Sequence, residues 1–210
     1  MNIIIRKVRV LAAPEPEGTF LRVRIPEGDL RMMLYKATTV DGATGVTVDW
    51  GDGTRETVAE IDNLVHDYPA AGEYVVAISD DIDELCPFNT SGETLAYKDR
   101  LFSVRATARR FVTTANFGFS GLPNLRELSL PNVRTLWNGV FSGCTGLVGE
   151  LCFPSVAAFG SAPRTMPFKD CSGVTAIRFA KANEAAIRAS SFWEKDPQLG
   201  AVNAVVKFDL

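Results

Sequence analysis

The amino-acid sequence predicts a mainly β protein in which a β-sandwich is followed by a short leucine-rich-repeat solenoid. Two observations predict this fold class. Short runs of alternating apolar and polar residues fill the first half, and this period of two is typical of half-buried antiparallel strands. The second half holds three copies of one pattern, separated by 22 and 27 residues, and repeats of this length indicate a solenoid. A chain of 210 residues, 46% of them apolar, is long enough to bury such cores.

The strands of the first half are expected from the N-terminus onward. Residues 2–11 are interpreted as a strand rather than a secretory signal, because three basic residues interrupt the apolar run. In the next run Leu21, Val23 and Ile25 alternate with two arginines. The remaining strands are expected at residues 30–37, 45–50, 55–60 and 73–79. Six or seven strands suit a β-sandwich.

Two blocks in this half resemble the paired signature of a PKD domain (polycystic kidney disease repeat). The first is Val48-Asp49-Trp50-Gly51-Asp52-Gly53-Thr54, and about a dozen residues later the second runs from His66-Asp67-Tyr68-Pro69 to Val76. The resemblance covers roughly residues 15–80. It implies an immunoglobulin-like β-sandwich that serves extracellular or surface proteins as a spacer or as a module contacting protein or glycan. It does not imply catalysis.

His66 is the single histidine, so any Ser-His-Asp or Cys-His mechanism would have to pass through it. The motif favours a structural role for His66, with hydrogen bonds across the sandwich. Trp50 is expected in the core between the two sheets.

The domain boundary is expected between the two patterns. Asp80, Asp81, Asp83 and Glu84 follow the last predicted sandwich strand, and carboxylates grouped on a loop can hold Ca²⁺. Their spacing does not match an EF-hand, so a solvated linker is the favoured interpretation. We therefore predict a sandwich over residues 1–85, a linker over 86–100 and a repeat domain over 101–210.

The repeat unit of the second half is a block from Phe to Leu followed by an alternating apolar pair. Its three copies begin at Phe119, Phe141 and Phe168. An imperfect copy upstream contains Ala106, Ala108 and Phe111, and one downstream runs from Phe192 to Leu199 and ends in Val206-Lys207-Phe208. Residues 180–191 form an Ala-rich insertion that we expect to be helical.

These units resemble the BspA-type leucine-rich repeats of bacterial surface proteins, in which a Phe-x-x-Cys-x-x-Leu block precedes a Leu-x-Leu-Pro strand. Leu128-Ser129-Leu130-Pro131 and Leu151-Cys152-Phe153-Pro154 match that strand, whereas the third copy has Ala180 in place of the proline. The resemblance covers roughly residues 100–210 and implies a surface protein that binds other molecules.

Four cysteines, Cys86, Cys144, Cys152 and Cys171, lack the two-residue spacing of zinc ribbons. Cys144 and Cys171 occupy equivalent positions of adjacent units, about 5 Å apart if the units stack. A disulfide between them is one alternative, and four free, buried thiols are the expectation.

The candidate binding surface is the outward side of the repeat strands, since residues between the core positions project outward. It comprises Arg105, Thr107, Glu127, Ser129, Glu150 and Arg178, together with Cys152 and Ala176. An ordinary solvated sheet face is the alternative. Trp137 and Trp193 lie outside these strands and are expected to be buried fillers rather than exposed anchors.

Composition and motifs exclude several classes of function. The net charge of −3 and pI near 5.3 argue against nucleic acid, and no run approaches the ~18–20 apolar residues of a membrane span. Without a phosphate loop, zinc helix or nucleophile elbow, we expect no enzyme, cofactor or metal. The predicted function is noncatalytic adhesion or recognition of a protein or glycan at a cell surface or outside the cell. The alternative is a virion-associated structural component, such as a phage or prophage tail or decoration protein.

Overall fold

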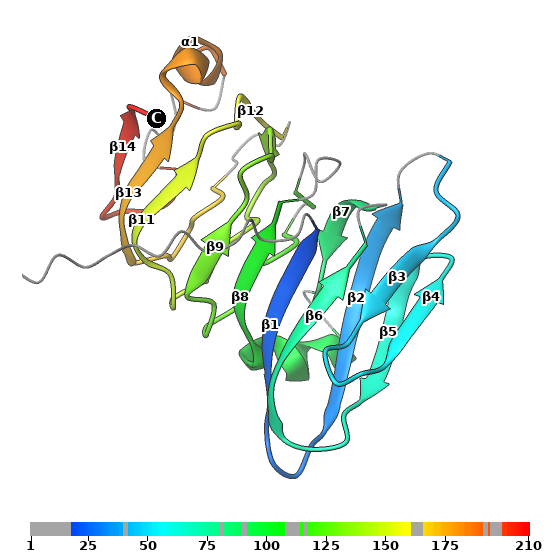
Figure 1. Cartoon of the computed structure of the whole chain (residues 1–210). Coiled ribbons are helices and arrows are strands. Elements are labelled where there is room, and N and C mark those ends of the chain that lie inside the picture. The colour runs from blue at the N-terminus through cyan, green and yellow to red at the C-terminus, as the bar shows by residue number, and fades with distance from the viewer. Residues whose placement is uncertain are drawn as a thin grey trace, which may run out of the picture.

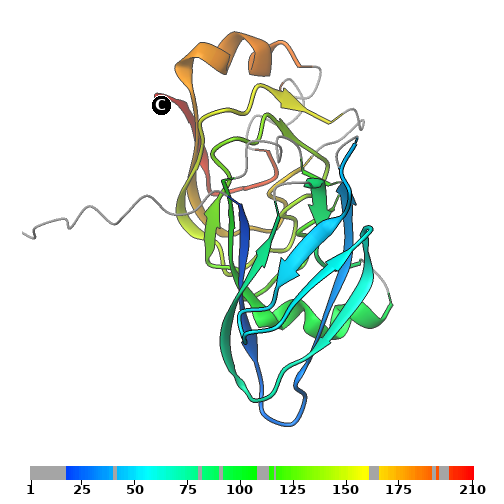
Figure 2. The ribbon, with the colours of Figure 1, turned by 45° about the vertical axis from the view of Figure 1, so that its right-hand side comes forward.

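A computed structural model of the chain describes residues 18–39, 42–79, 82–89, 92–107, 114–115, 117–160, 166–190, 193 and 199–210. Strands hold 44% of these residues, so the prediction of a mainly β protein is confirmed. Figures 1 and 2 show a row of strands that continues from the first half of the chain into a stack formed by the second half. The strand predicted at residues 2–11 lies outside the described residues.

The first half of the chain supplies two sheets. A six-stranded sheet has the order β4-β3-β6-β1-β8-β9, and a three-stranded antiparallel sheet has the order β5-β2-β7. The bounds are β1 Thr19–Ile25, β2 Arg31–Thr39, β3 Val46–Asp49, β4 Arg55–Val58, β5 Ile61–Asp67, β6 Gly72–Ile78 and β7 Ile82–Cys86.

Alternation along β1 shows why these strands form a layered core. Leu21 and Val23 are fully buried, whereas Arg22 and Arg24 between and after them are exposed. Leu34 from β2, in the other sheet, belongs to the same continuous apolar cluster. Each sheet thus covers the apolar side of the other and leaves its charged side to solvent.

Two strands of this half, β5 and β7, are absent from the sequence prediction. In β5 the alternation breaks at Asn63, which has a positive φ of 51°. Polar residues dominate β5, and only Ile61 is fully buried. β7 contains Asp83 and Glu84, two of the acidic residues assigned to a solvated linker, but Ile82 and Leu85 beside them are fully buried.

The six-stranded sheet joins the two halves of the chain. β8 (Leu101–Ala106) pairs antiparallel with β1 and parallel with β9 (Glu127–Ser129). The predicted linker, 86–100, is folded in part: it contains the 3₁₀ helix η1 (Glu93–Arg100) with buried Tyr97 and Arg100. The division into domains at 85 and 101 stays a prediction, and sheet hydrogen bonds cross it.

The second half is a β-solenoid-like stack, which confirms the solenoid expectation. β11 (Val148–Phe153), β13 (Gly173–Phe179) and β14 (Val205–Phe208) pair in parallel, and a second parallel ladder joins β10 (Thr135–Leu136) to β12 (Ala158–Phe159). Within each ladder the strands run in one direction because each strand of the ladder belongs to a successive turn. The second ladder is absent from the sequence prediction.

Equivalent phenylalanines stack from turn to turn. The ring centroids of Phe119 and Phe141 are 5.7 Å apart, and those of Phe141 and Phe168 are 5.5 Å apart. The Phe141 amide donates to the Pro167 carbonyl, and the other two phenylalanine amides make the corresponding bonds. The sequence alignment of the three copies is therefore also the structural one.

The last turn differs from the predicted fourth copy. In the first three turns the amides of Leu125, Leu147 and Val174 donate to the carbonyl three residues earlier, and in the last turn Ala204 donates to Ala201. The block aligned on Phe192 to Leu199 is therefore wrong in register, because the insertion shifts the turn to residues 199–204. The Ala-rich insertion contains η2 (Lys181–Asn183) and α1 (Glu184–Arg188), which confirms the helical expectation.

All four cysteines are free. The Cys144 thiol donates to the Phe119 carbonyl and the Cys171 thiol to the Phe141 carbonyl, each at 3.0 Å. Each thiol thus satisfies a buried carbonyl of the preceding turn, which explains a cysteine at this place in the unit. Cys86 is half-buried and Cys152 is exposed, so the expectation of burial fails for these two.

In the native protein we expect a thiol reagent to modify Cys152 alone. Burial raises the pKa of Cys144 to about 12 and the pKa values of Cys86 and Cys171 to about 11, which removes the reactive thiolates near neutral pH. Colorimetric titration at pH 7.5 should count one fast thiol before denaturation and four after it. Cys152→Ser should abolish the fast phase, and two or more fast thiols in the native chain would contradict the prediction.

Candidate functional site

Four of the six predicted site residues lie on β8, β9 and the residue after β8. Arg105 and Ser129 are partners in the β8–β9 register, and Glu127 is the partner of Ser103. Glu127 and Ser129 are exposed, as expected, whereas Arg105 and Thr107 are half-buried. The Thr107 amide donates to the Gly18 carbonyl at 2.9 Å, which fixes the end of β8 against the start of β1.

The other two, Glu150 and Arg178, form an ionic network across the stack. Glu150 Oε2 lies 3.5 Å from Arg178 Nη1, and Glu150 Oε1 lies 3.0 Å from Lys207 Nζ. Arg178 Nε lies 2.9 Å from Asp209 Oδ1, and this hydrogen bond lowers the pKa of Asp209. These groups are partly exposed, so the network defines a charged surface more than it adds stability.

The expectation that Ala176 projects outward to solvent is wrong. It is the register partner of Glu150, but only 2% of it is exposed. A register shift lies just before it, between Gly149 and Glu150. Ala176 lies between its register partners Glu150 of β11 and Val205 of β14 and is buried, so it offers no surface to a ligand.

We define the outer strand face as the solvent side of β1, β8, β9, β11, β13 and β14, on which Arg24, Arg105, Glu127, Ser129, Glu150 and Arg178 lie. These strands follow one another across Figure 1. Backbone pairing is interrupted once, since β9 ends the six-stranded sheet and β11 begins the next. The predicted residues therefore form two groups on one face.

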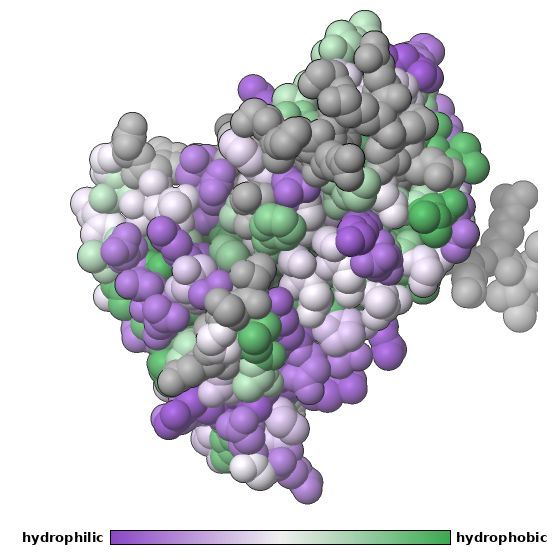
Figure 3. Space-filling view, turned by 180° about the vertical axis from the view of Figure 1, so that it is seen from behind, coloured by the Kyte–Doolittle hydropathy of each residue, from purple (hydrophilic) through white to green (hydrophobic). Residues whose placement is uncertain are grey.

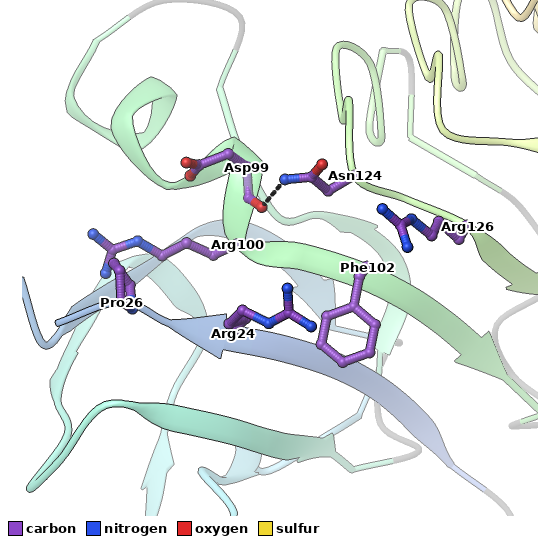
Figure 4. A pocket seen from close by; sticks show the side chains of 7 residues that line it. All are labelled: Arg24, Pro26, Asp99, Arg100, Phe102, Asn124 and Arg126. Atoms are coloured by element: carbon purple, nitrogen blue, oxygen red, sulfur yellow. Dashed lines mark hydrogen bonds between the residues drawn. The ribbon is translucent and has the colours of Figure 1, made fainter.

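A pocket lies at one end of the outer strand face, with a volume of about 210 Å³. Its walls come from both halves of the chain: Arg24 and Pro26 at the end of β1, Asp99 and Arg100 of η1, Phe102 of β8, and Asn124 and Arg126 before β9. In Figure 4 the guanidinium groups of Arg24 and Arg126 extend toward Phe102 from different elements. Phe102 lies opposite a register shift in β1, between Arg22 and Val23.

The arginines of the pocket differ in how firmly they are held. Arg100 is 5% exposed and is bound to Asp29, so it is part of the scaffold. Arg24 pairs with Glu73 across β1 and β6, but its side chain is 70% exposed, and exposed pairs of this kind are weak. Arg126 is exposed and forms no ion pair with any residue that the structure describes. Arg24 and Arg126 are therefore the cations available to a ligand.

The pocket is absent from the sequence prediction. Arg24 belongs to the predicted sandwich, whereas Phe102 and Arg126 belong to the predicted repeat domain. They meet because β1 pairs with β8, a contact between residues about 80 positions apart that no local pattern encodes. In the sequence, Arg22 and Arg24 alternate with the apolar residues of their strand, and this pattern indicated only that both arginines are exposed.

His66 and Trp50 occupy a structural network, as the sequence predicts. The rings stack with centroids 4.6 Å apart, and His66 Nε2 lies 2.8 Å from Asp52 Oδ2. Trp50 is 1% exposed, and the Tyr68 hydroxyl donates to its carbonyl at 3.2 Å. Burial raises the pKa of Asp52, but hydrogen bonds from Thr54 and His66 outweigh it and bring the pKa to about 2.

The remaining sequence candidates add no second site. Asp80 and Asp81 lie outside the described residues, and no three His, Cys, Asp or Glu side chains of the described part are placed to hold a metal ion. Trp137 and Trp193 are half-buried. Nor does the described part contain a helix long and apolar enough to cross a membrane. Figure 3 shows hydrophilic and hydrophobic residues interspersed on the side opposite to the view of Figure 1.

Comparisons with known proteins do not place the chain in a family: no family model matches it, and neither do curated proteins or solved structures.

Proposed function

We propose that this chain is a noncatalytic recognition protein that contacts a protein or glycan at a cell surface or outside the cell. The observation that carries the proposal is the outer strand face, where charged and small polar side chains from both halves form one exposed surface. A pocket at its end gives this surface a place for a specific contact. Solenoid strand faces commonly bind partners in this way.

The first half is proposed to be a PKD-like, immunoglobulin-like sandwich. Both blocks of the motif support it, because they meet in the network of Trp50, Asp52, His66 and Tyr68 between two packed sheets. Gly51 supports it as well. Its φ is +81°, and a Cβ there would lie 2.5 Å from the Val75 carbonyl oxygen. The first block therefore requires glycine at the point where its backbone approaches that of the second block.

The second half is proposed to be a short array of BspA-type leucine-rich repeats. The stacked phenylalanines support it, as do the thiols of Cys144 and Cys171, which bond to carbonyls of the preceding turn. Surface proteins with such repeats act through shape and charge rather than chemistry, so no cofactor is proposed.

A binding role is favoured over catalysis by how the reactive groups are used. His66 is stacked on Trp50 and hydrogen-bonded to Asp52, with 13% of its side chain exposed. The thiols of Cys144 and Cys171 are buried and protonated near neutral pH. These groups stabilise the fold, whereas the polar groups exposed on the outer strand face can contact a partner.

The test is binding of the purified chain to a panel of glycans, extracellular-matrix proteins and bacterial cell surfaces. We expect saturable binding to one class and at least a tenfold loss of affinity in Ser129→Arg or Glu150→Arg, because either change alters the shape or charge of the face. Glu60→Arg, an exposed site in the turn between β4 and β5, is the matched control and should bind as wild type. The proposal would be contradicted if the chain bound no member of the panel. It would also be contradicted if Ser129→Arg, Glu150→Arg and Glu60→Arg all bound with equal affinity.

A further inference from the structure

We propose that the pocket formed by Arg24, Phe102, Asn124 and Arg126 binds the carboxylate of an acidic sugar, such as a terminal or internal uronate of a glycan. This inference rests on the proposed recognition function and specifies its ligand. It is carried by four properties of the pocket: available cations, local charge, an aromatic wall with an unused acceptor, and size.

The cations are Arg24 and Arg126, which converge on one space. A guanidinium binds a carboxylate through two parallel hydrogen bonds, and such charge-assisted bonds are stronger than neutral ones. Arg126 has no competing ion pair among the described residues. The weak, exposed Arg24–Glu73 pair can be exchanged for a ligand carboxylate at little cost.

The charge around the pocket is opposite in sign to that of the whole chain. The net charge is −3, yet three arginines, Arg24, Arg100 and Arg126, line the pocket beside a single carboxylate, Asp99. A local excess of cations attracts an anionic ligand and raises its rate of association.

The wall and rim of the pocket match a ring that carries hydroxyl groups. Phe102 is half-buried and lines the pocket, and the Arg24 guanidinium lies over its ring, 5.7 Å from the ring centroid. The part of the ring that Arg24 leaves exposed is available to the apolar C–H face of a sugar. The Asn124 amide nitrogen donates to the Asp99 carbonyl at 2.6 Å, as the dashed line in Figure 4 shows. Its carbonyl oxygen is left as an acceptor for a hydroxyl.

The chemistry of the pocket favours an acidic sugar over an acidic peptide, and the size of the pocket suits a sugar. A volume of about 210 Å³ can hold one monosaccharide-sized group. A glutamate side chain would use the arginines and leave both the phenyl surface and the Asn124 acceptor unused. A uronate supplies a carboxylate, hydroxyls and an apolar ring face at once.

The experiment is isothermal titration calorimetry with three matched probes: a trisaccharide of galacturonic acid, its methyl ester, and triglutamate. The acid trisaccharide should bind, and the ester and the peptide should each bind at least tenfold more weakly. Arg126→Ala should weaken binding of the acid trisaccharide at least about tenfold, the effect of losing a charge-assisted pair. Phe102→Leu, which keeps an apolar side chain but removes the ring, should weaken it about threefold or more.

Arg22→Ala is the control, since Arg22 is an exposed arginine on the same strand and face that does not line the pocket. It should bind as wild type, and all variants should melt within about 3 °C of wild type because these sites are not in the buried core. Absence of acid-trisaccharide binding, equal binding of the ester or peptide, or an equal loss in Arg22→Ala would overturn the inference. If the chain binds a surface of the panel while Arg126→Ala leaves that binding intact, the pocket inference fails and the proposed function stands.

Discussion

Replacing Phe141 by alanine is expected to lower the free energy of unfolding by about 3–5 kcal/mol, the usual cost of removing a buried phenyl ring. Phe141 is fully buried and is the middle ring of the stack, in contact with Phe119 at 5.7 Å and Phe168 at 5.5 Å between centroids. Phe153 approaches it from the strand side at 6.3 Å. The cavity would thus lie where two turns and a strand meet.

Urea unfolding followed by far-UV circular dichroism measures this loss. Phe117→Ala is the control, because Phe117 is 37% exposed and its truncation should cost about 1 kcal/mol or less. Equal losses in the two variants would show that the stack of rings does not hold the turns together.

Asp52→Asn is expected to lower the free energy of unfolding by about 2–3 kcal/mol at pH 7. The carboxylate accepts from the Thr54 amide at 2.9 Å, from the Thr54 hydroxyl at 2.6 Å and from His66 at 2.8 Å, and only 2% of its side chain is exposed. An amide cannot accept all three bonds and would place a donor against donors.

The pH dependence of this loss has a definite sign. The pKa of Asp52 is about 2 in the folded chain against 3.8 for the ordinary group, so folding favours the ionised form. A depressed pKa contributes stability that is present above about pH 4 and is lost as the pH falls toward 2. The shift corresponds to roughly 2 kcal/mol. The difference between wild type and Asp52→Asn should therefore shrink by about that amount between pH 5 and pH 2.

Free energies of unfolding measured in urea at several pH values test this, because other carboxylates titrate equally in both proteins and cancel in the difference. Asp62→Asn is the matched control, since Asp62 is exposed and its carboxylate accepts from the neighbouring Asn63 side chain. A difference between wild type and Asp52→Asn that stays constant from pH 5 to pH 2 would exclude Asp52 as the titrating group.

The candidate site divides into a part that the sequence predicts and a part that it does not. Period-two alternation correctly placed Glu127, Ser129 and Glu150 on the exposed side of their strands, because side-chain direction depends on the strand itself. Alternation failed at Ala176, since its burial depends on neighbouring strands. The pocket was missed because its walls come from both halves of the chain.

Local pattern was enough to predict the alternation of β1, the repeat of Phe119, Phe141 and Phe168, and the absence of disulfides among the four cysteines. The tertiary structure shows which strands pair, and local pattern does not, because pairing depends on the best joint burial of distant segments rather than on either segment alone. It added the polar strand β5 and the acidic strand β7, and it joined β1 to β8 across the expected boundary. That one pairing brings Arg24, Phe102 and Arg126 together and creates the pocket.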